Sequence, residues 1–244
     1  MIRGISMIRL DKYLTEMSVG SRSSVKKLIK SGRVLVDGKE VTRPETKVDE
    51  NISQIVVDGK KVSYNKYEYY MLNKPQGYVS ATTDKEHKTV VDIIETSEKK
   101  DLFPVGRLDI DTEGLLLITN NGELAHKLLS PKKHVKKRYY VEVSGILNET
   151  DRRKVKEGLD IGEEKLTLPA DMSDIKTDME RGVSSCILTI HEGKFHQVKR
   201  MMKKLGKTVT YLKRVSMGAL LLDEDLKCGE YRRLTDEEVD KLLK

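Results

Sequence analysis

Residues 106–122, Gly-Arg-Leu-Asp-Ile-Asp-Thr-Glu-Gly-Leu-Leu-Leu-Ile-Thr-Asn-Asn-Gly, decide how the larger part of the chain folds. Residues 115–119 are almost all apolar and lie between a glycine and an Asn-Asn-Gly turn, which predicts a buried strand. Two carboxylates, Asp109 and Asp111, precede this strand. A carboxylate held beside a buried strand is fixed in place and partly desolvated, as catalytic acids are. An ordinary polar turn that leads into a core strand is the alternative, and we interpret Asp111 as bracing that turn.

Positive charge is concentrated in three segments of this chain of 244 residues, whose formal net charge is +7. No acidic residue occurs in residues 17–36, 127–138 or 193–222, and lysines and arginines are frequent in all three. Such clustering is typical of a protein that contacts a phosphate backbone, whereas solvated helix faces normally mix both signs. The distribution of charge therefore favours a nucleic acid partner.

Cysteine usage and hydropathy predict a cytoplasmic protein. The two cysteines, Cys186 and Cys228, are far apart in the sequence, so we expect free thiols in a reducing compartment. No apolar stretch is typical of a signal peptide or of a membrane span, so no membrane partner is expected. Residues 1–6 precede a second methionine, Met7, and we interpret them as a loose extension.

No metal site is predicted. Asp109, Asp111 and Glu113 match the first half of a calcium-binding EF-hand loop, but its twelfth position is Asn120 instead of a bidentate glutamate. The histidines and cysteines show no spacing that is typical of zinc ligands.

Residues 8–58 form the predicted core of a small N-terminal domain, which we assign to residues 1–60. Apolar residues at helical spacing predict a first short helix, and Ser21 is the expected N-cap of a second helix that ends at Gly32. A strand over 34–36 then enters an Asp-Gly hairpin turn. Cations in this region are expected to contact a nucleic acid backbone: Arg22, Lys26, Lys27, Lys30 and Arg33.

The N-terminal segment also matches a known pattern. Residues 9–38, with Arg-Leu-Asp-Lys-Tyr-Leu at their start and Gly-x-Val-x-Val-Asp-Gly at their end, resemble the RNA-binding domain named for ribosomal protein S-four, the alpha-L motif. The resemblance implies that this domain docks on RNA. A basic helix that only keeps the protein in solution is the alternative.

A linker over residues 61–66 is predicted to precede a second domain over residues 67–244. Segments with strand-like patterns and segments with helical periodicity are mixed along this domain, which predicts an α+β fold. The predicted strands are 67–72, 115–119, 139–143, 185–190 and 208–214, and the predicted helices are 123–129, 151–158, 198–205 and 235–243. Thr235 and Glu238 form a capping box for the last helix, and residues 73–78 form a turn by composition.

The pattern Gly-Arg-Leu-Asp-x-Asp-Thr-x-Gly-Leu-Leu-Leu-x-Thr-Asn at residues 106–120 resembles the catalytic motif of ribosomal RNA pseudouridine synthases of the RsuA type. Residues 73–77, 137–141 and 193–201 resemble further blocks of that family. The resemblance implies a catalytic domain with a central, largely antiparallel sheet. It also implies that uridine is isomerised to pseudouridine and that Asp109 is the essential aspartate. The reaction loses no group and changes no oxidation state, so no cofactor is expected.

An ionised Asp109 in a partly dry pocket needs a nearby cation, and the resemblance implies that this cation is Lys199. A stripe of apolar residues over 198–205 runs beside Lys199, and we interpret it as core packing. Lys203 and Lys204 on the same predicted helix are interpreted as phosphate contacts or solvated charges.

Two further residues are implied to touch the substrate. Tyr139 would lie against the target base, where its ring could stack on an extruded uracil. Val141 and Val143 share its face of the predicted strand, so core packing is a compatible role. Arg107 is implied to contact RNA and to hold the base outside its stack, and a surface salt bridge is the alternative. His196 is interpreted as a structural histidine.

Together these patterns predict a site-specific ribosomal RNA pseudouridine synthase. The His-Gln-Val-Lys form of the last block and the chain length resemble the small-subunit branch of this family, which implies 16S rRNA as the substrate. The expected partner is ribosomal RNA or a pre-ribosomal particle, and we expect a monomer. Three alternatives stay open: an enzyme for large-subunit 23S rRNA, a non-catalytic RNA-binding ribosome assembly factor, and an RNA glycosylase that releases the base.

Overall fold

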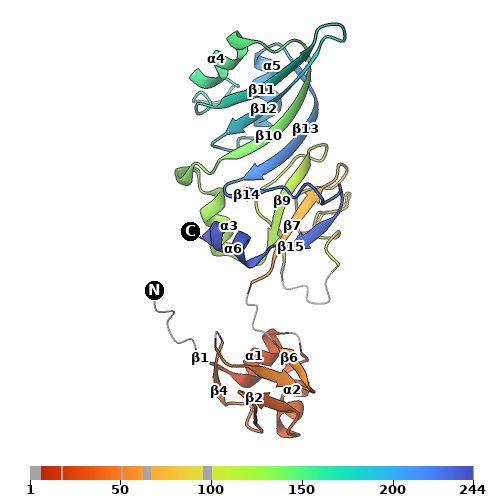
Figure 1. Cartoon of the computed structure of the whole chain (residues 1–244), viewed down its shortest axis with the longest axis vertical. Helices are drawn as coiled ribbons and strands as arrows, with labels where there is room; N and C mark the ends of the chain where they lie inside the picture. Colours follow the sequence, from red (N-terminus) through yellow and green to blue (C-terminus); the bar gives the residue numbers. More distant parts are fainter. Residues whose placement is uncertain (1–6, 18, 51, 63–66, 96–100, 244) are drawn as a thin grey trace. The chain divides into compact units, whose positions relative to one another are not determined.

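The computed structural model describes residues 7–17, 19–50, 52–62, 67–95 and 101–243 (Figure 1). Contacts between Cα atoms divide the chain into two compact units, with the boundary between Tyr67 and Glu68. The expected loose extension over residues 1–6 lies outside the described residues.

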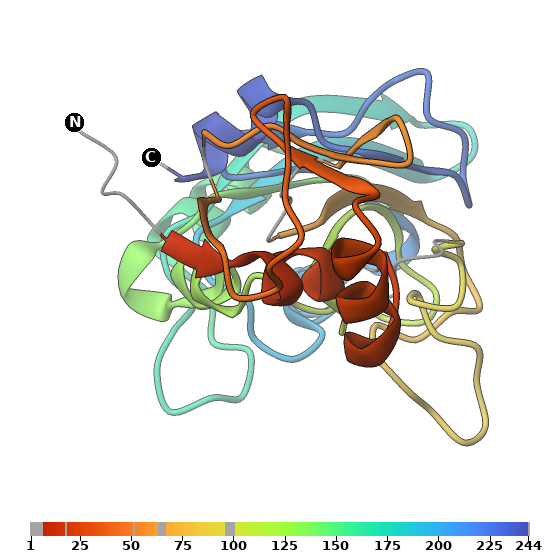
Figure 2. The ribbon, with the colours of Figure 1, turned by 90° about the horizontal axis from the view of Figure 1, so that it is seen from below.

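The N-terminal unit packs two helices against short strands. The helices are α1 (Leu10–Glu16) and α2 (Arg22–Lys30), and Figure 2 shows them side by side. A four-stranded antiparallel sheet has the order β3-β2-β5-β6, and β1 pairs with β4. The strands are β1 (Met7–Arg9), β2 (Val34–Val36), β3 (Lys39–Glu40), β4 (Lys47–Asp49), β5 (Ile55–Val57) and β6 (Lys60–Val62). Apolar side chains from both helices and from the strands form one buried core.

Local signals in this unit are confirmed. The Ser21 hydroxyl caps α2 by accepting a hydrogen bond from the backbone N–H of Ser24 at 3.3 Å. The helix ends one turn residue before Gly32, whose φ of +74° suits glycine. Asp37 and Gly38 both have positive φ angles, 50° and 79°, as the predicted two-residue hairpin turn requires.

The linker expected over residues 61–66 differs from the structure in its first two residues. Lys61 and Val62 belong to β6, which pairs with β5. Val62 packs against the core of the N-terminal unit, and this burial outweighs the polar composition from which a linker was predicted. Residues 63–66 lie outside the described residues.

The second unit is built on a nine-stranded sheet whose main path is β11-β12-β10-β13-β9-β7-β15. β14 pairs with β13, and β8 pairs with β9. All of these pairings are antiparallel except β13 with β9, so the expected largely antiparallel sheet is confirmed. The strands are β7 (Tyr69–Lys74), β8 (Phe103–Pro104), β9 (Glu113–Thr119), β10 (Lys137–Ser144), β11 (Asp171–Asp178), β12 (Val183–Ile190), β13 (Thr208–Met217), β14 (Leu220–Leu221) and β15 (Tyr231–Arg233).

Four α-helices cover this sheet. They are α3 (Gly122–Leu129), α4 (Glu149–Glu157), α5 (Gln197–Lys204) and α6 (Asp236–Leu243), and a 3-10 turn follows α3 at Pro131–Lys133. The apolar stripe of α5 packs into the same core as the inward side chains of β10 and β12, as predicted. Residues of α3 and α6 contribute to a second core with Leu115 and Leu117 of β9. Because successive residues of β9 face opposite sides, this one strand is buried by both cores.

Four strands of this unit were not predicted: β8 and β14, which have two residues each, and β11 and β15. β11 is mostly exposed and rich in charge, so it lacks the apolar alternation that identifies a half-buried strand. β15 has only three residues and pairs with β7. Asn73 and Lys74, expected in a turn, are the last residues of β7 and are fully buried.

Candidate active site

The two most strongly implied residues meet in the structure. Asp109 lies in the segment that leads into β9, and Lys199 lies in the first turn of α5. The Lys199 Nζ is 3.2 Å from Asp109 Oδ2 and 2.6 Å from Asp111 Oδ1. One ammonium therefore serves two carboxylates that are separated from it by about ninety residues of chain.

Solvent exposure distinguishes these two acids. The Asp111 side chain is 59% exposed, whereas that of Asp109 is 27% exposed and lines a cavity of this unit. Partial burial acts to raise the pKa of Asp111, but the hydrogen bond and charge of Lys199 outweigh it and hold that pKa below its usual value. The same two acids raise the pKa of Lys199, although its own burial acts in the opposite direction. The cluster therefore holds an ammonium between carboxylates.

A buried lysine holds the loop that carries both acids. Lys74 is completely inaccessible to solvent, and its Nζ donates to the backbone carbonyls of Pro75, Asp109 and Thr112 at 2.9–3.0 Å. A longer contact of 3.4 Å reaches the carbonyl of Ile110. Burial lowers the pKa of Lys74 to about 8, against the opposing charges of the nearby acids. The sequence shows this lysine only as part of an Asn-Lys-Pro turn pattern, which carries no sign of its burial.

The cavity in front of Asp109 has a volume of about 570 Å³. Tyr139, from β10, lines it and is only 7% exposed. The same side chain belongs to the core cluster of Val141 and Val143, so packing and cavity lining coexist. Asp109, Lys199 and Tyr139 are thus brought together at one cavity, as expected from the sequence.

Arg107 also lines this cavity and is exposed. In the described part of the chain it forms no ion pair, so the alternative of a surface salt bridge with Asp111 or Glu113 is not observed. Glu113 instead accepts a hydrogen bond from the Tyr211 hydroxyl at 2.7 Å. The Arg107 guanidinium is therefore available to a ligand at the mouth of the cavity.

His196 is closer to the acid than the sequence indicated. Its Nε2 is 3.5 Å from Asp109 Oδ1, and its backbone has a positive φ of 48° directly before α5. The imidazole stacks on the ring of Phe195, with 3.8 Å between ring centroids. Phe195 itself is 65% exposed and lines the cavity. Spacing alone gave no signal for this aromatic pair.

The predicted RNA-contacting cations fall into two groups. Arg22, Lys26, Lys27 and Lys30 are exposed on α2, and Lys203 is exposed on α5. Arg33 pairs with Asp58 through two short hydrogen bonds, and Lys204 lies 3.3 Å from Asp160. The charge of these last two residues is therefore partly neutralised within the protein.

The described residues contain no group of three or more His, Cys, Asp or Glu side chains that could hold a metal ion. Within the same residues, no helix is long and apolar enough to cross a membrane. Both cysteines are free, Cys186 buried and Cys228 exposed.

The chain thus combines a small basic unit of helices and short strands with a sheet unit whose cavity is lined by a carboxylate paired with an ammonium. The family of RNA pseudouridylate synthases matches residues 68–204, and the S4 domain matches residues 8–51. The chain belongs to the RNA pseudouridylate synthase family, which confirms the expected class of enzyme.

Several known proteins are similar over almost the whole chain. Ribosomal large subunit pseudouridine synthase B of Bacillus subtilis is 41% identical, covering 97% of this chain and 96% of the relative. Ribosomal small subunit pseudouridine synthase A of Vibrio vulnificus is 39% identical, covering 97% and 100%. A crystal structure of a pseudouridylate synthase matches with a TM-score of 0.65 and 34% identity, covering 96% of this chain and 99% of that one.

Proposed function

We propose that this protein isomerises one specific uridine of ribosomal RNA to pseudouridine, with Asp109 as the essential acid. The observation that carries the proposal is the contact of Asp109 with Lys199 at the wall of a cavity that Tyr139 also lines. The target base enters this cavity after it has left its stack, since the reacting atoms are inaccessible in a duplex. The Tyr139 ring then offers the uracil a flat apolar surface.

The chemistry needs only a positioned carboxylate. The C1′–N1 bond of the uridine breaks, the base turns, and C5 bonds to C1′ while the C5 proton is lost and N1 gains a proton. Asp109 acts either as the nucleophile that captures the sugar or base, or as the base that removes a sugar proton. Lys199 orients this carboxylate in either role, because its Nζ lies 3.2 Å from Asp109 Oδ2.

Asp109 is preferred to Asp111 because only Asp109 lines the cavity. Asp111 is the more exposed of the two acids and makes the shorter contact with Lys199, which suits a residue that positions the ammonium. Because both acids contact Lys199, substitution of Asp111 is a matched comparison for substitution of Asp109.

Asp109→Asn and Asp111→Asn test this assignment. Unmodified 16S and 23S transcripts and pre-ribosomal particles would be incubated with each protein, and pseudouridine would be mapped by chemical labelling. We expect no detectable product with Asp109→Asn and a measurable, reduced rate with Asp111→Asn. The proposal fails if Asp109→Asn still isomerises uridine while its fold is intact.

The same mapping tests the choice of RNA. The form His-Gln-Val-Lys at residues 196–199 supports small-subunit 16S rRNA, although named relatives of both kinds are similar to the chain. A product in 16S rRNA is the expected result, and a product in 23S rRNA alone would reassign the enzyme to the large subunit. Release of free uracil would indicate a glycosylase, and RNA binding without any product would indicate an assembly factor.

The domain roles follow the same proposal. The N-terminal domain docks on RNA through the exposed cations of α2, which can contact successive phosphates. The catalytic domain contributes Lys203 beside the cavity, because α5 carries both Lys199 and Lys203. We expect the protein to act as a monomer in the cytoplasm and without a cofactor.

A further inference from the structure

The lining of the cavity includes a buried arginine with one hydrogen-bond donor that no acceptor of the described residues satisfies. Arg214 of β13 is 2% exposed and lines the cavity. Its Nε donates to the carbonyl of Leu115 at 2.8 Å, but its buried Nη2 has no acceptor among the described residues. A buried charged donor without an acceptor costs about 1–3 kcal/mol or more of folding free energy. A stable protein therefore keeps such a donor where a ligand or a water molecule supplies the missing hydrogen-bond acceptor.

A second cation lies on the same inward face of the sheet. Lys137 of β10 is 9% exposed and also lines the cavity. Its Nζ donates to the carbonyl of Val135 at 3.0 Å, which leaves two of its three donors. Burial and the charge of Arg214 both lower the pKa of Lys137, as expected of two cations held close together.

The strand register places these cations beside Tyr139. Tyr139 is the direct partner of Arg214 across β10 and β13, and Lys137 precedes it by two residues and so shares its face. Neither cation forms an ion pair with any carboxylate of the described residues. The charge of Glu192 acts to raise the pKa of Lys137. The carboxylate of Glu192, however, accepts hydrogen bonds from the Leu168 backbone N–H and from the Gln197 side chain.

We propose that Arg214 and Lys137 form a cationic floor that receives the carbonyl oxygens of the extruded uracil and stabilises the negative charge that develops on this base. The inference rests on the proposed function and extends it from the acid to the other partner of the reaction. A uracil that lies against Tyr139 is adjacent to Arg214, because these two residues are opposite each other in the sheet.

The cavity offers a hydrogen-bonding pattern that suits uracil better than phosphate. Thr112 also lines it, and its buried hydroxyl oxygen has no partner among the described residues. Uracil presents an acceptor, a donor and an acceptor along O2, N3–H and O4, whereas phosphate oxygens only accept. Two cations and one hydroxyl that can accept therefore match the edge of the base. A phosphate would be served by exposed Arg107 at the mouth.

The cationic floor of Arg214 and Lys137 acts on the negative charge that the reaction places on the uracil. When the C1′–N1 bond breaks, its electron pair stays with N1 and spreads onto O2 and O4. C1′ is then satisfied by bonding to an Asp109 oxygen or by loss of the C2′ proton to that oxygen. If Asp109 instead adds to C6 of the ring, the electron pair moves toward C5 and O4. Every route places negative charge on the base carbonyls, where preorganised donors lower the barrier.

The test compares leaving groups of different stability. Arg214→Met, Arg214→Lys and Lys137→Met would be assayed in single turnover on RNA that carries either uridine or 5-fluorouridine at the target. Fluorine stabilises the uracil anion, so it compensates for a missing cation. In Arg214→Met we expect cleavage of the C1′–N1 bond to slow by about 100-fold on uridine RNA and by clearly less on 5-fluorouridine RNA. Arg214→Lys keeps a positive charge, so cleavage of either RNA should slow less in this variant than in Arg214→Met. The affinity for RNA should change little.

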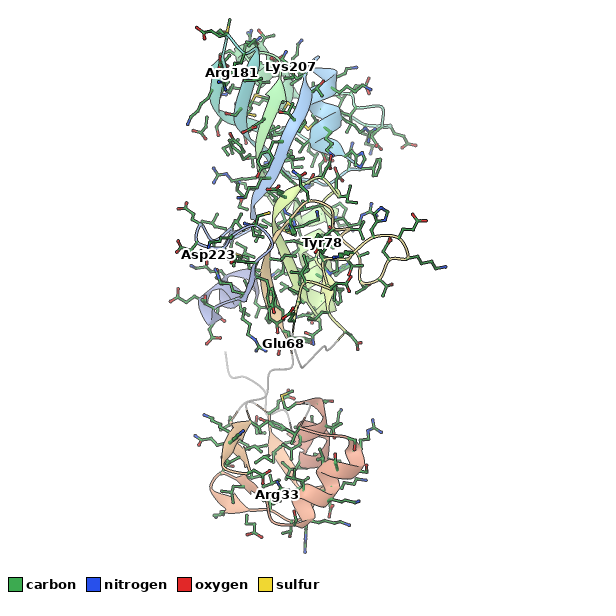
Figure 3. The ribbon with its side chains drawn as sticks, turned by 90° about the vertical axis from the view of Figure 1, so that its right-hand side faces the viewer. Arg33, Glu68, Tyr78, Arg181, Lys207 and Asp223 are labelled. Atoms are coloured by element: carbon green, nitrogen blue, oxygen red, sulfur yellow. The ribbon has the colours of Figure 1, made fainter. Side chains whose placement is uncertain are left out.

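Lys207→Met is the matched control. Lys207 is a largely buried cation that pairs with Asp151 at 3.5 Å, lies where α5 leads into β13 (Figure 3) and does not line the cavity. This control should affect both RNAs equally, and circular dichroism would verify the fold of each variant. If Arg214→Met does not fold, Lys137→Met and Arg214→Lys decide the outcome.

Equal losses on uridine and 5-fluorouridine RNA would refute the cationic floor and leave a purely structural role. A loss of RNA affinity with unchanged cleavage rates would also refute it, because that result indicates a phosphate at the floor. Turnover of the uridine RNA by the unaltered protein tests the proposed function separately, so the two failures are distinguishable.

Discussion

At the scale of single residues, the site depends on three cations that differ in burial, since Lys199 is partly exposed and Lys74 and Arg214 are buried. Lys199 contacts the carboxylates of Asp109 and Asp111, Lys74 contacts backbone carbonyls, and Arg214 has a donor left over. A buried charge is tolerated when hydrogen bonds or an opposite charge compensate for its loss of hydration. These three cations therefore have separate tests.

Lys199→Met removes the only cation that contacts both acids in the described residues. The Asp109 carboxylate then loses the ammonium that orients it, and Asp111 loses the hydrogen bond and the charge that hold its pKa below the usual value. We expect pseudouridine formation to fall by about 100-fold, a typical loss when one electrostatic partner at an active site is removed. Single-turnover rates would measure this effect, with Lys154→Met, an exposed lysine of α4, as the control. Near-normal turnover by a folded Lys199→Met protein would exclude Lys199 from the site.

Lys74 predicts a dependence of stability on pH. Its pKa is about 8 in the folded protein and near its ordinary value in the unfolded chain, so the unfolded chain binds more protons between these values. The free energy of unfolding that is due to Lys74 therefore rises with pH from about 8 to 10.5, by roughly 3 kcal/mol in all. Urea unfolding of the unaltered protein and of Lys74→Met across this range would reveal the difference. A difference that stays constant with pH would contradict the shifted pKa.

At the scale of elements, the decisive contact is the parallel pairing of β9 with β13. Gly114 of β9 is paired with Lys74 on one side and with Arg214 on the other. Its φ is +100°, and a Cβ at this position would lie 2.3 Å from the carbonyl oxygen of Arg214. The glycine that follows the catalytic segment is therefore required by the close approach of two backbones.

Gly114→Ala should destabilise the protein by about 2–4 kcal/mol, because it combines a strained φ with a backbone clash. Gly182→Ala is the matched control, since Gly182 has a φ of +65° but open space around its Cβ position. Chemical denaturation of both variants would separate strain from clash. Equal losses of stability in the two variants would argue against the steric role of Gly114.

The sequence was most informative for elements whose structure is determined by their own residues. The apolar run of β9, the Ser21 cap and the stripe of α5 are local patterns, and each was predicted near its observed place. The burial of Lys74 and Arg214 was not predicted, because a charged residue in a turn or in a strand normally indicates a solvent-facing side chain. Likewise, the pairing of β9 with β13 joins segments about a hundred residues apart, and no local pattern specifies which strands become neighbours.

At the scale of the whole molecule, the protein divides into a basic RNA-binding unit and a catalytic unit that have separate cores. Deleting residues 1–66 should preserve the fold of the catalytic unit and weaken its binding to structured rRNA. Isomerisation of short RNA at high concentration should remain. Circular dichroism and single-turnover assays would measure both effects, and full activity on rRNA after the deletion would contradict the docking role.

Charge on α2 makes a quantitative prediction for the intact chain. Replacing Lys26, Lys27 and Lys30 together by glutamine should reduce the slope of log Kd against log salt by about 2–3, because each phosphate contact contributes close to one. Lys154→Gln, an exposed change on α4, should leave that slope unaltered. An unchanged slope for the triple variant would show that α2 does not contact the backbone.

The sheet of the catalytic unit has one narrow joint. Strands β11, β12 and β10 reach strands β9, β7 and β15 only through β13, and β13 meets β9 at just two residue pairs, Lys213 with Glu113 and Arg214 with Gly114. The carboxyl group comes from the chain on one side of this joint, and its ammonium partner comes from the helix on the other. The position of the carboxylate relative to its ammonium therefore depends on the register of these two residue pairs.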